Sequence, residues 1–164
     1  MDLRRASASD YELLLPLFLG LREFSRAGHP PQHDDFALVL AASHAYLREV
    51  LARGLECQTL LALAGDGRLA GYLIVSVHEP NPLTSSGAVR TGSIDELFVS
   101  ATHRGSGAGS LLVETACSWL VEQRAEWVEV GAYAWNTAGI GFYEREGFAP
   151  WSVTLMKSLG GDGT

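Results

Sequence analysis

The chain has 164 residues, of which 47% are hydrophobic and 19% charged, as is typical of one globular domain. Its formal net charge is −7, whereas binding to a nucleic-acid backbone requires an excess of basic residues, so we expect no nucleic-acid partner. The longest apolar stretch, residues 13–21, is too short to cross a membrane, and residues 1–5 lack the apolar core of a signal peptide. We therefore expect a cytoplasmic protein without a membrane partner.

A short strand and a helix are the first predicted elements. Ser9 and Glu12 have the spacing of a capping box, in which each side chain accepts a hydrogen bond from the other residue's amide. Leucines and Phe18 then recur at helical spacing. Pro16 lies inside this pattern and has no amide hydrogen to donate, so the sequence predicts a kink or a late start of the helix.

A second helix and a β-hairpin complete the first half of the chain. Asp34 or Asp35 can cap the helix, and Gly54 ends it. The turn signal at 65–68 contains two glycines and joins two alternating apolar segments, which predicts a hairpin. The two strands of the hairpin are expected over 59–64 and 69–77.

Strands and helices are predicted to alternate in the second half, after a polar loop over 80–92. The expected elements are a strand over 94–100, a helix over 106–124, a strand over 127–134, a helix over 137–146 and a last strand over 151–156. No repeat or linker interrupts them. We therefore predict a single mixed α/β domain over 1–159 and a disordered tail over 160–164.

A glycine-rich turn within residues 94–110 is the most informative feature. It follows a strand and opens a helix, so that unpaired amides and the positive end of the helix dipole point at one place, which favours pyrophosphate. Arg104 adds a charged donor at the rim. A Walker A loop would need a lysine here, and a dinucleotide fingerprint would need glycine where Ser110 stands. A flexible connection without a ligand is the plain alternative.

Two motifs in register resemble those of the GNAT acetyltransferases, which use acetyl-CoA. The first is Arg104-x-x-Gly107-x-Gly109, which follows a strand ending in Leu97-Phe98-Val99. The second consists of Asn136, Tyr143, Gly147 and Phe148. The departures are Gly139, where the family usually has alanine, and Ala101 and His103 before the first motif. The order of the predicted elements extends the resemblance over nearly the whole chain.

The resemblance implies the GNAT fold, of the α/β (α+β) class. This is a single mixed, mostly antiparallel sheet of six or seven strands with a central V-shaped splay, flanked by about four helices. Acetyl-CoA would enter the splay between strands 94–100 and 127–134 and pair with the first of them like an added strand. The cofactor-binding residues implied are Leu97, Phe98, Val99, Arg104, Gly105, Ser106, Gly107, Ala108, Gly109, Ser110, Asn136 and Tyr143.

The same resemblance suggests the catalytic groups. Tyr143 matches the family's usual general acid and would protonate the departing thiolate. Asp95 and Glu96 are both candidates for the base, and since neighbouring side chains of a regular strand point to opposite faces, only one should face the acceptor. We favour Asp95, although a β-bulge would weaken this parity argument and a water chain could also remove the proton. His78, at the end of the hairpin, is a further candidate for substrate contact.

These residues predict an N-acetyltransferase that works by direct transfer in a ternary complex. The acidic charge favours a small cationic acceptor, such as a polyamine or an aminoglycoside, over an acidic one, and a peptide amine is the next candidate. His29 and His33 would lie near the acceptor entrance. No metal is expected, because Cys57 and Cys117 form no CxxC pair. A catalytically silent CoA-binding module, another kind of nucleotide-binding protein, and a homodimer of the enzyme stay open.

Overall fold

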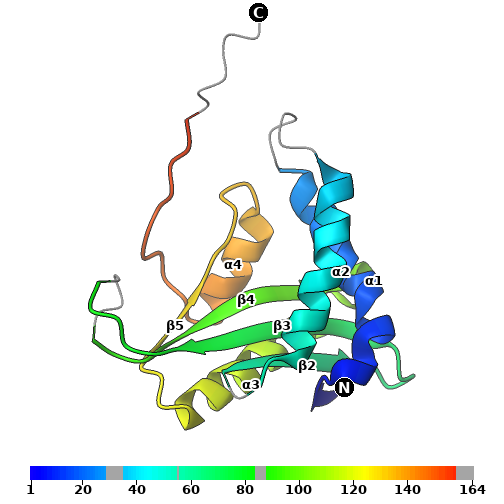
Figure 1. The fold of residues 1–164 in the computed structure, drawn as a ribbon, viewed down its shortest axis with the longest axis horizontal. Coiled ribbons are helices and arrows are strands. Elements are labelled where there is room, and N and C mark those ends of the chain that lie inside the picture. The colour runs from blue at the N-terminus through cyan, green and yellow to red at the C-terminus, as the bar shows by residue number, and fades with distance from the viewer. Residues whose placement is uncertain (29–34, 55, 84–87, 158–164) are drawn as a thin grey trace, which may run out of the picture. The chain divides into compact units, whose positions relative to one another are not determined.

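The computed structural model describes residues 1–28, 35–54, 56–83 and 88–157. Its sheet has five strands in the order β1-β2-β3-β4-β5, not the six or seven expected (Figure 1). The strands are β1 (Asp2–Arg5), β2 (Cys57–Leu63), β3 (Leu69–His78), β4 (Thr91–Val99) and β5 (Trp127–Val130). The helices are α1 (Tyr11–Arg26), α2 (Phe36–Ala52), α3 (Ala108–Glu122) and α4 (Thr137–Arg145), with 3-10 turns at Ala8–Asp10 and Ala101–His103.

Two compact units divide the chain, Met1–Tyr133 and Ala134–Thr164. The first contains the whole sheet with α1, α2 and α3, and the second contains α4. The single domain over 1–159 stays a prediction, and the tail over 160–164 lies outside the described residues. None of the described helices is long and apolar enough to cross a membrane.

Both faces of the sheet in the first unit are covered by helices (Figure 1). On one face, Phe18 of α1 and Leu47 of α2 pack with Tyr72 and Ile74 of β3 in a buried cluster. On the other face α3 approaches so closely that a Cβ added at Gly92 would lie 2.4 Å from the side chain of Leu120. Since alternate residues of a strand point to opposite faces, β3 is buried along almost its whole length.

Strand β4 extends beyond its parallel neighbour β5. The ladder between them pairs Thr91 with Trp127 and ends where Ile94 pairs with Val130, whereas β4 continues to Val99. The antiparallel ladder on the other side of β4 follows it to Val99. The two strands therefore separate after Ile94, which leaves the β5 side of residues 95–99 outside the ladder, and β5 ends four residues before the predicted end of the strand.

The last predicted strand, over 151–156, is wrong. The segment has no strand geometry, and Trp151, Val153 and Leu155 are 79%, 82% and 90% exposed. Alternating apolar residues stabilise a strand only when a neighbouring strand accepts its hydrogen bonds and one face is covered, and neither condition is met for these residues. The strand count was overestimated for this reason.

The start of α1 differs from its prediction. Instead of a Ser9–Glu12 box, Asp10 accepts hydrogen bonds from the Ser7 amide at 2.8 Å and from the Arg4 guanidinium at 2.6 and 2.9 Å. The guanidinium hydrogen bonds hold the pKa of the Asp10 carboxyl well below its usual range. The predicted late start is also wrong, because α1 begins at Tyr11 and continues through Pro16. A proline so near the N-terminus removes only one of the helix's many backbone bonds.

The hairpin and the other helix boundaries agree better with the prediction. Gly67 adopts the left-handed conformation in the turn between β2 and β3, and this confirms the hairpin. Asp35 caps α2 through the amide of Leu38, and Asp34 lies outside the described residues. Helix α3 begins at 108 rather than 106 because Gly107 has a φ of 85°, which no residue of a right-handed helix adopts.

Candidate active site

The turn between β4 and α3 has the backbone that the glycine pattern indicated. Gly105 and Gly107 both have positive φ, of 76° and 85°, and a Cβ added at either would meet no described atom within 4 Å. Gly107 is the N-cap of α3, and the first backbone bond of the helix is donated by Leu111 to the Gly107 carbonyl at 3.0 Å. The amides of Ala108 and Gly109 therefore come before this first bond, at the helix end where anions bind.

Arg104 lies at the rim of this turn. Its guanidinium carbon is 5.7 Å from the centre of the Phe24 ring and 6.0 Å from that of Phe98. Arginine next to an aromatic face keeps its hydrogen-bond donors directed outward while the ring attracts its charge. The predicted arginine is thus supported by α1 and β4 together, and Phe24 is a part of this arrangement that the sequence analysis did not identify.

A β-bulge in β4 places both candidate carboxylates on one face of the sheet. Along the ladder with β3, Ile74 pairs with Glu96 but Val75 pairs with Ile94, so Asp95 is the extra residue. Asp95 then bonds Ser76 while Glu96 bonds Tyr72, and these two β3 partners lie four residues apart on the same face. Both carboxylates lie on the side of α1 and α2, so the bulge removes the strand alternation on which the expectation of a single carboxylate facing the acceptor was based.

Glu96 is held in a buried network between β4 and α1. Its carboxylate forms an ion pair with Arg22 and accepts a hydrogen bond from the Tyr72 hydroxyl at 2.8 Å, and its side chain is 9% exposed. Burial raises the pKa of Glu96, although the charge of Arg22 opposes this shift. The Arg22 guanidinium also stacks 4.3 Å above the centre of the Phe18 ring. Glu96 therefore has one partner in the covering helix α1 and one in the neighbouring strand β3.

Removing Arg22 should leave the buried Glu96 carboxylate without its ion-pair partner. We expect Arg22→Met to lower the free energy of unfolding by about 3 kcal/mol, and Arg22→Met with Glu96→Leu to recover most of that loss. An unpaired Glu96 is easier to bury when it is protonated. The difference in stability between the wild type and Arg22→Met should therefore become smaller as the pH is lowered. Urea denaturation of the three proteins between pH 5 and 8 measures this, and a double variant no more stable than the single one would contradict it.

Asp95 has a different environment, which is open to solvent. Its carboxylate accepts hydrogen bonds from Ser76 and from Ser93, both at 2.5 Å. The Nε2 atom of His78 lies 2.8 Å from the same Ser93 hydroxyl. Asp95 and His78 are both exposed, and no basic side chain is paired with Asp95 among the ion pairs of the described residues. Of the two carboxylates, Asp95 is therefore the one available to a solute.

The second unit carries the remaining predicted residues. The Asn136 side chain caps α4 by accepting a hydrogen bond from the Gly139 amide at 3.0 Å, and a Cβ at Gly139 would lie 2.4 Å from the Asn136 amide nitrogen. The Asn136 side chain thus occupies the place of a Cβ at position 139, which explains why glycine stands there instead of the family's usual alanine. Tyr143 packs edge-on against Phe142 and Phe148, and burial raises the pKa of Tyr143 to about 12.

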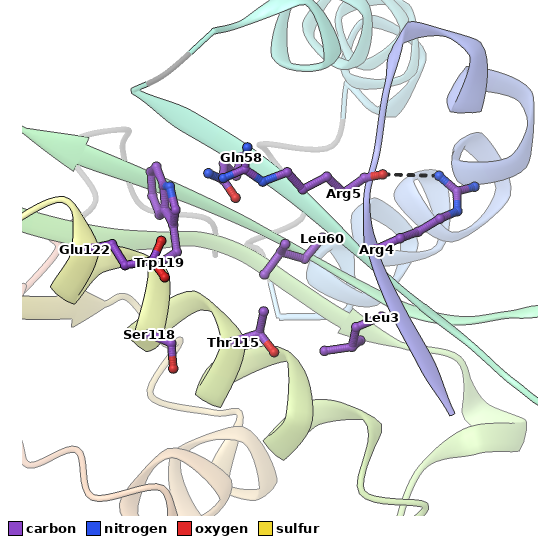
Figure 2. Close-up of a pocket in the computed structure, with 9 residues that line it drawn as sticks. All are labelled: Leu3, Arg4, Arg5, Gln58, Leu60, Thr115, Ser118, Trp119 and Glu122. Atoms are coloured by element: carbon purple, nitrogen blue, oxygen red, sulfur yellow. Dashed lines mark hydrogen bonds between the residues drawn. The ribbon is translucent and has the colours of Figure 1, made fainter.

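A pocket of about 330 Å³ lies away from all these residues. It is formed by β1 and β2 together with the C-terminal half of α3 (Figure 2). Its β2 residues Gln58 and Leu60 pair with Val75 and Leu73, on the opposite sheet face from Ser76 and Tyr72. The pocket therefore belongs neither to the carboxylate site nor to the glycine turn. His29 and His33, predicted near the entrance, lie outside the described residues.

Comparison with known protein families shows the family to which the chain belongs. The model of the acetyltransferase (GNAT) family matches residues 21–148, which include the β4 strand, the glycine turn and Tyr143. The chain belongs to the GNAT family. Two curated relatives, the mycothiol acetyltransferases of Salinispora tropica and Salinispora arenicola, are both 34% identical to this GNAT chain, over 102 and 95 residues. These matches cover 62% and 57% of the chain but only 32% and 29% of the relatives, about a third of their length.

Solved structures share the fold of this GNAT protein at low sequence identity. One is a mutant protein from Bacillus halodurans, with a TM-score of 0.78, 20% identity, and coverage of 97% of this chain and 99% of the other. A ribosomal-protein-alanine N-acetyltransferase from Brucella melitensis has a TM-score of 0.67, 23% identity, and coverage of 96% and 100%. An aminoglycoside N-acetyltransferase in complex with CoA has a TM-score of 0.72, 15% identity, and coverage of 96% and 98%.

Proposed function

We propose that this protein is an N-acetyltransferase that moves the acetyl group of acetyl-CoA to a primary amine by direct transfer in a ternary complex. The observation that carries the proposal is the pair of left-handed glycines, Gly105 and Gly107, which open α3 beside the end of β4. This backbone offers amides to a pyrophosphate without a side chain in the way. Membership of the GNAT family supports acetyl-CoA as the molecule that brings the pyrophosphate.

The co-substrate would be held along β4. Its pyrophosphate would contact Arg104 and the amides of residues 105 and 107–110, since the Ser106 amide donates to the His103 carbonyl at 3.2 Å. Its pantetheine arm would pair with Leu97, Phe98 and Val99 as an added strand. The end of the β4–β5 ladder at Ile94 supports this placement, because the arm needs backbone groups that β5 does not use. Asn136 would bond the same arm, as the family resemblance suggests.

The transfer requires a proton acceptor, a site for the developing oxyanion and a proton donor. The contacts of Glu96 with Arg22 and Tyr72 favour Asp95 as the carboxylate that takes part in removing the amine proton. Amides of β4 near Leu97 would stabilise the oxyanion. Tyr143 would protonate the sulfur, a role that suits a hydroxyl whose raised pKa, about 12, keeps it protonated.

The acceptor belongs to one of three chemical classes. The net charge of −7 supports a small polycation such as a polyamine or an aminoglycoside, and a peptide amine comes next. The name of the curated relatives adds an acceptor of the mycothiol class. A silent CoA-binding module is the alternative on the same fold, and the exposed Asp95 with its two serine donors argues against it, since binding alone does not require a solvent-facing carboxylate.

A turnover assay separates the enzyme from the silent module. Release of CoA from acetyl-CoA should be measured with spermidine, kanamycin A, an alanine-terminated peptide and an acetylated-lysine control peptide that has no free amine. We expect turnover with at least one free amine and none with the control. Calorimetry that detects acetyl-CoA binding, together with no turnover on any amine, would favour the silent module; no binding at all would reject both.

A further inference from the structure

Four polar side chains form a continuous hydrogen-bonded row across β3 and β4, in which Ser76 is buried and Asp95 and His78 are exposed. The Ser76 hydroxyl and the Ser93 hydroxyl both reach the Asp95 carboxylate at 2.5 Å, and His78 Nε2 reaches the Ser93 hydroxyl at 2.8 Å. Ser76 pairs with Ser93 across the β3–β4 ladder, and His78 pairs with Thr91, so the backbone itself holds the row in register. The bulge at Asp95 turns its carboxylate onto the face where His78 ends β3.

The directions of these hydrogen bonds determine which nitrogen of His78 carries the proton. An ionised carboxylate has only acceptor oxygens, so each serine must donate its single hydrogen to Asp95. The Ser93 oxygen can then only accept from the imidazole, which makes Nε2 of His78 the donor. In the neutral ring the lone pair is therefore on Nδ1, the nitrogen that takes no part in the row.

We propose that His78 is the group that receives the proton of the acceptor amine, on Nδ1, and that Ser93 and Asp95 are positioning residues behind it. An imidazole is a stronger base than a carboxylate, with an ordinary pKa of about 6.5 against about 3.9. A carboxylate that orients an imidazole and stabilises its cation is the arrangement of catalytic triads, here with a serine hydroxyl in between. This inference rests on the proposed function and changes the direct role of Asp95 into one exerted through His78.

The proton balance is complete within the proposed reaction. One ammonium proton moves to Nδ1 of His78 and leaves to water from its exposed ring. The free amine then attacks the thioester carbon, and as the C–S bond breaks Tyr143 gives its proton to the sulfur. The second amine proton returns through water to the Tyr143 oxygen, so that the products are the amide and the CoA thiol and the Tyr143 hydroxyl is restored. Each step uses the amine and the acetyl thioester only, so no further co-reactant is needed.

Other ionisable groups surround the row. From β2, the Cys57 thiol bonds Ser76 and burial raises its pKa. Tyr46 of α2 and Arg53, the residue that follows α2, interact electrostatically with this region, and burial raises the pKa of Tyr46. Glu96 is paired with Arg22, and Glu79, next to His78 in sequence, is paired with Arg90. Burial raises the pKa of Glu96 toward the range of an imidazole, so an acid limb is assigned to His78 only if His78→Gln removes it.

The tautomer can be tested without any substrate. Nitrogen-15 NMR of the full chain, labelled in its histidine rings and assigned by His78→Gln, distinguishes Nε2–H from Nδ1–H imidazole. We expect His78 to be entirely Nε2–H at pH 8, Ser93→Ala to let the Nδ1–H form appear at the fraction that a free histidine ring shows, and Ser76→Ala, which deletes the other hydroxyl on the same carboxylate, to keep the wild-type state. An Nδ1–H ring in the wild type would overturn the proposal whatever the enzyme's activity.

Kinetics then test the role of His78 in the reaction of acetyl-CoA with whichever amine of the turnover assay the wild type acetylates. We expect His78→Gln to lower kcat/KM by about 100-fold, to remove the acid limb of its pH profile, and to be partly rescued by added imidazole. Ser93→Ala should lose about tenfold and Ser76→Ala clearly less. An unchanged acid limb in His78→Gln, with normal turnover, would reject His78 and leave the proposed function intact, whereas no turnover in the wild type would reject the proposed function itself.

Discussion

Gly107→Val is expected to abolish acetyl-CoA binding. Gly107 caps α3 with a φ of 85°, and a Cβ there would extend into the open space before the helix N-terminus. A valine would both disfavour this backbone and occupy the place where phosphate oxygens must approach the amides. Calorimetric titration with acetyl-CoA should show affinity reduced by at least about 100-fold, which corresponds to about 2.7 kcal/mol.

The β2–β3 turn offers a matched control for this variant. Gly67 has a φ of 80° and equally open surroundings, but it lies between the strands of the hairpin rather than at a helix N-terminus. Gly67→Val should destabilise the protein through the same backbone strain, about 1–2 kcal/mol, and leave acetyl-CoA affinity unchanged. Equal losses of affinity in the two variants would show that strain alone is responsible and that the turn at Gly107 does not bind the diphosphate.

The second large effect is expected at Tyr143. Tyr143→Phe keeps the ring contacts with Phe142 and Phe148 and removes only the hydroxyl. If this hydroxyl protonates the leaving thiolate, kcat should fall by about 100-fold while the affinity for acetyl-CoA stays within about twofold. Steady-state kinetics and calorimetry on the same preparation measure both quantities. An unchanged kcat would remove Tyr143 from the reaction.

The raised pKa of Tyr143 adds a test in the wild-type enzyme. An acid works only while protonated, and burial raises this pKa to about 12 from an ordinary value of about 10. The kcat of the wild type should therefore show no loss from tyrosine ionisation up to about pH 10.5. Tyr11→Phe, which removes another partly buried hydroxyl, bonded to His44 at 2.6 Å, is the control and should retain full turnover.

Local patterns predicted most of the first unit correctly. The alternating residues around the turn at Gly67 identified the hairpin, and the glycines at 105 and 107 identified the left-handed turn before α3, because both features depend on a few neighbouring residues. The last strand, over 151–156, was predicted by the same alternation and is wrong, since a strand also needs a partner that its own residues do not specify.

The site was predicted less completely than the fold. Asp95 and Glu96 were identified as candidates, but the bulge that puts both on one face has no signature in β4 and depends on the register with β3. Arg22 and Tyr72, which engage Glu96, are distant in sequence and carried no motif. The serine donors of Asp95 follow only from the paired positions of Ser76 and Ser93, which a single sequence does not show.

The early separation of β4 from β5 has a practical consequence. Residues 95–99 of β4 leave one edge of backbone outside the parallel ladder in the middle of a sheet, and such edges recruit strands from other molecules. An acyl carrier seated there would shield that edge and, by mass action, raise the melting temperature. Samples kept with CoA should accordingly resist aggregation during concentration and storage better than samples kept in plain buffer.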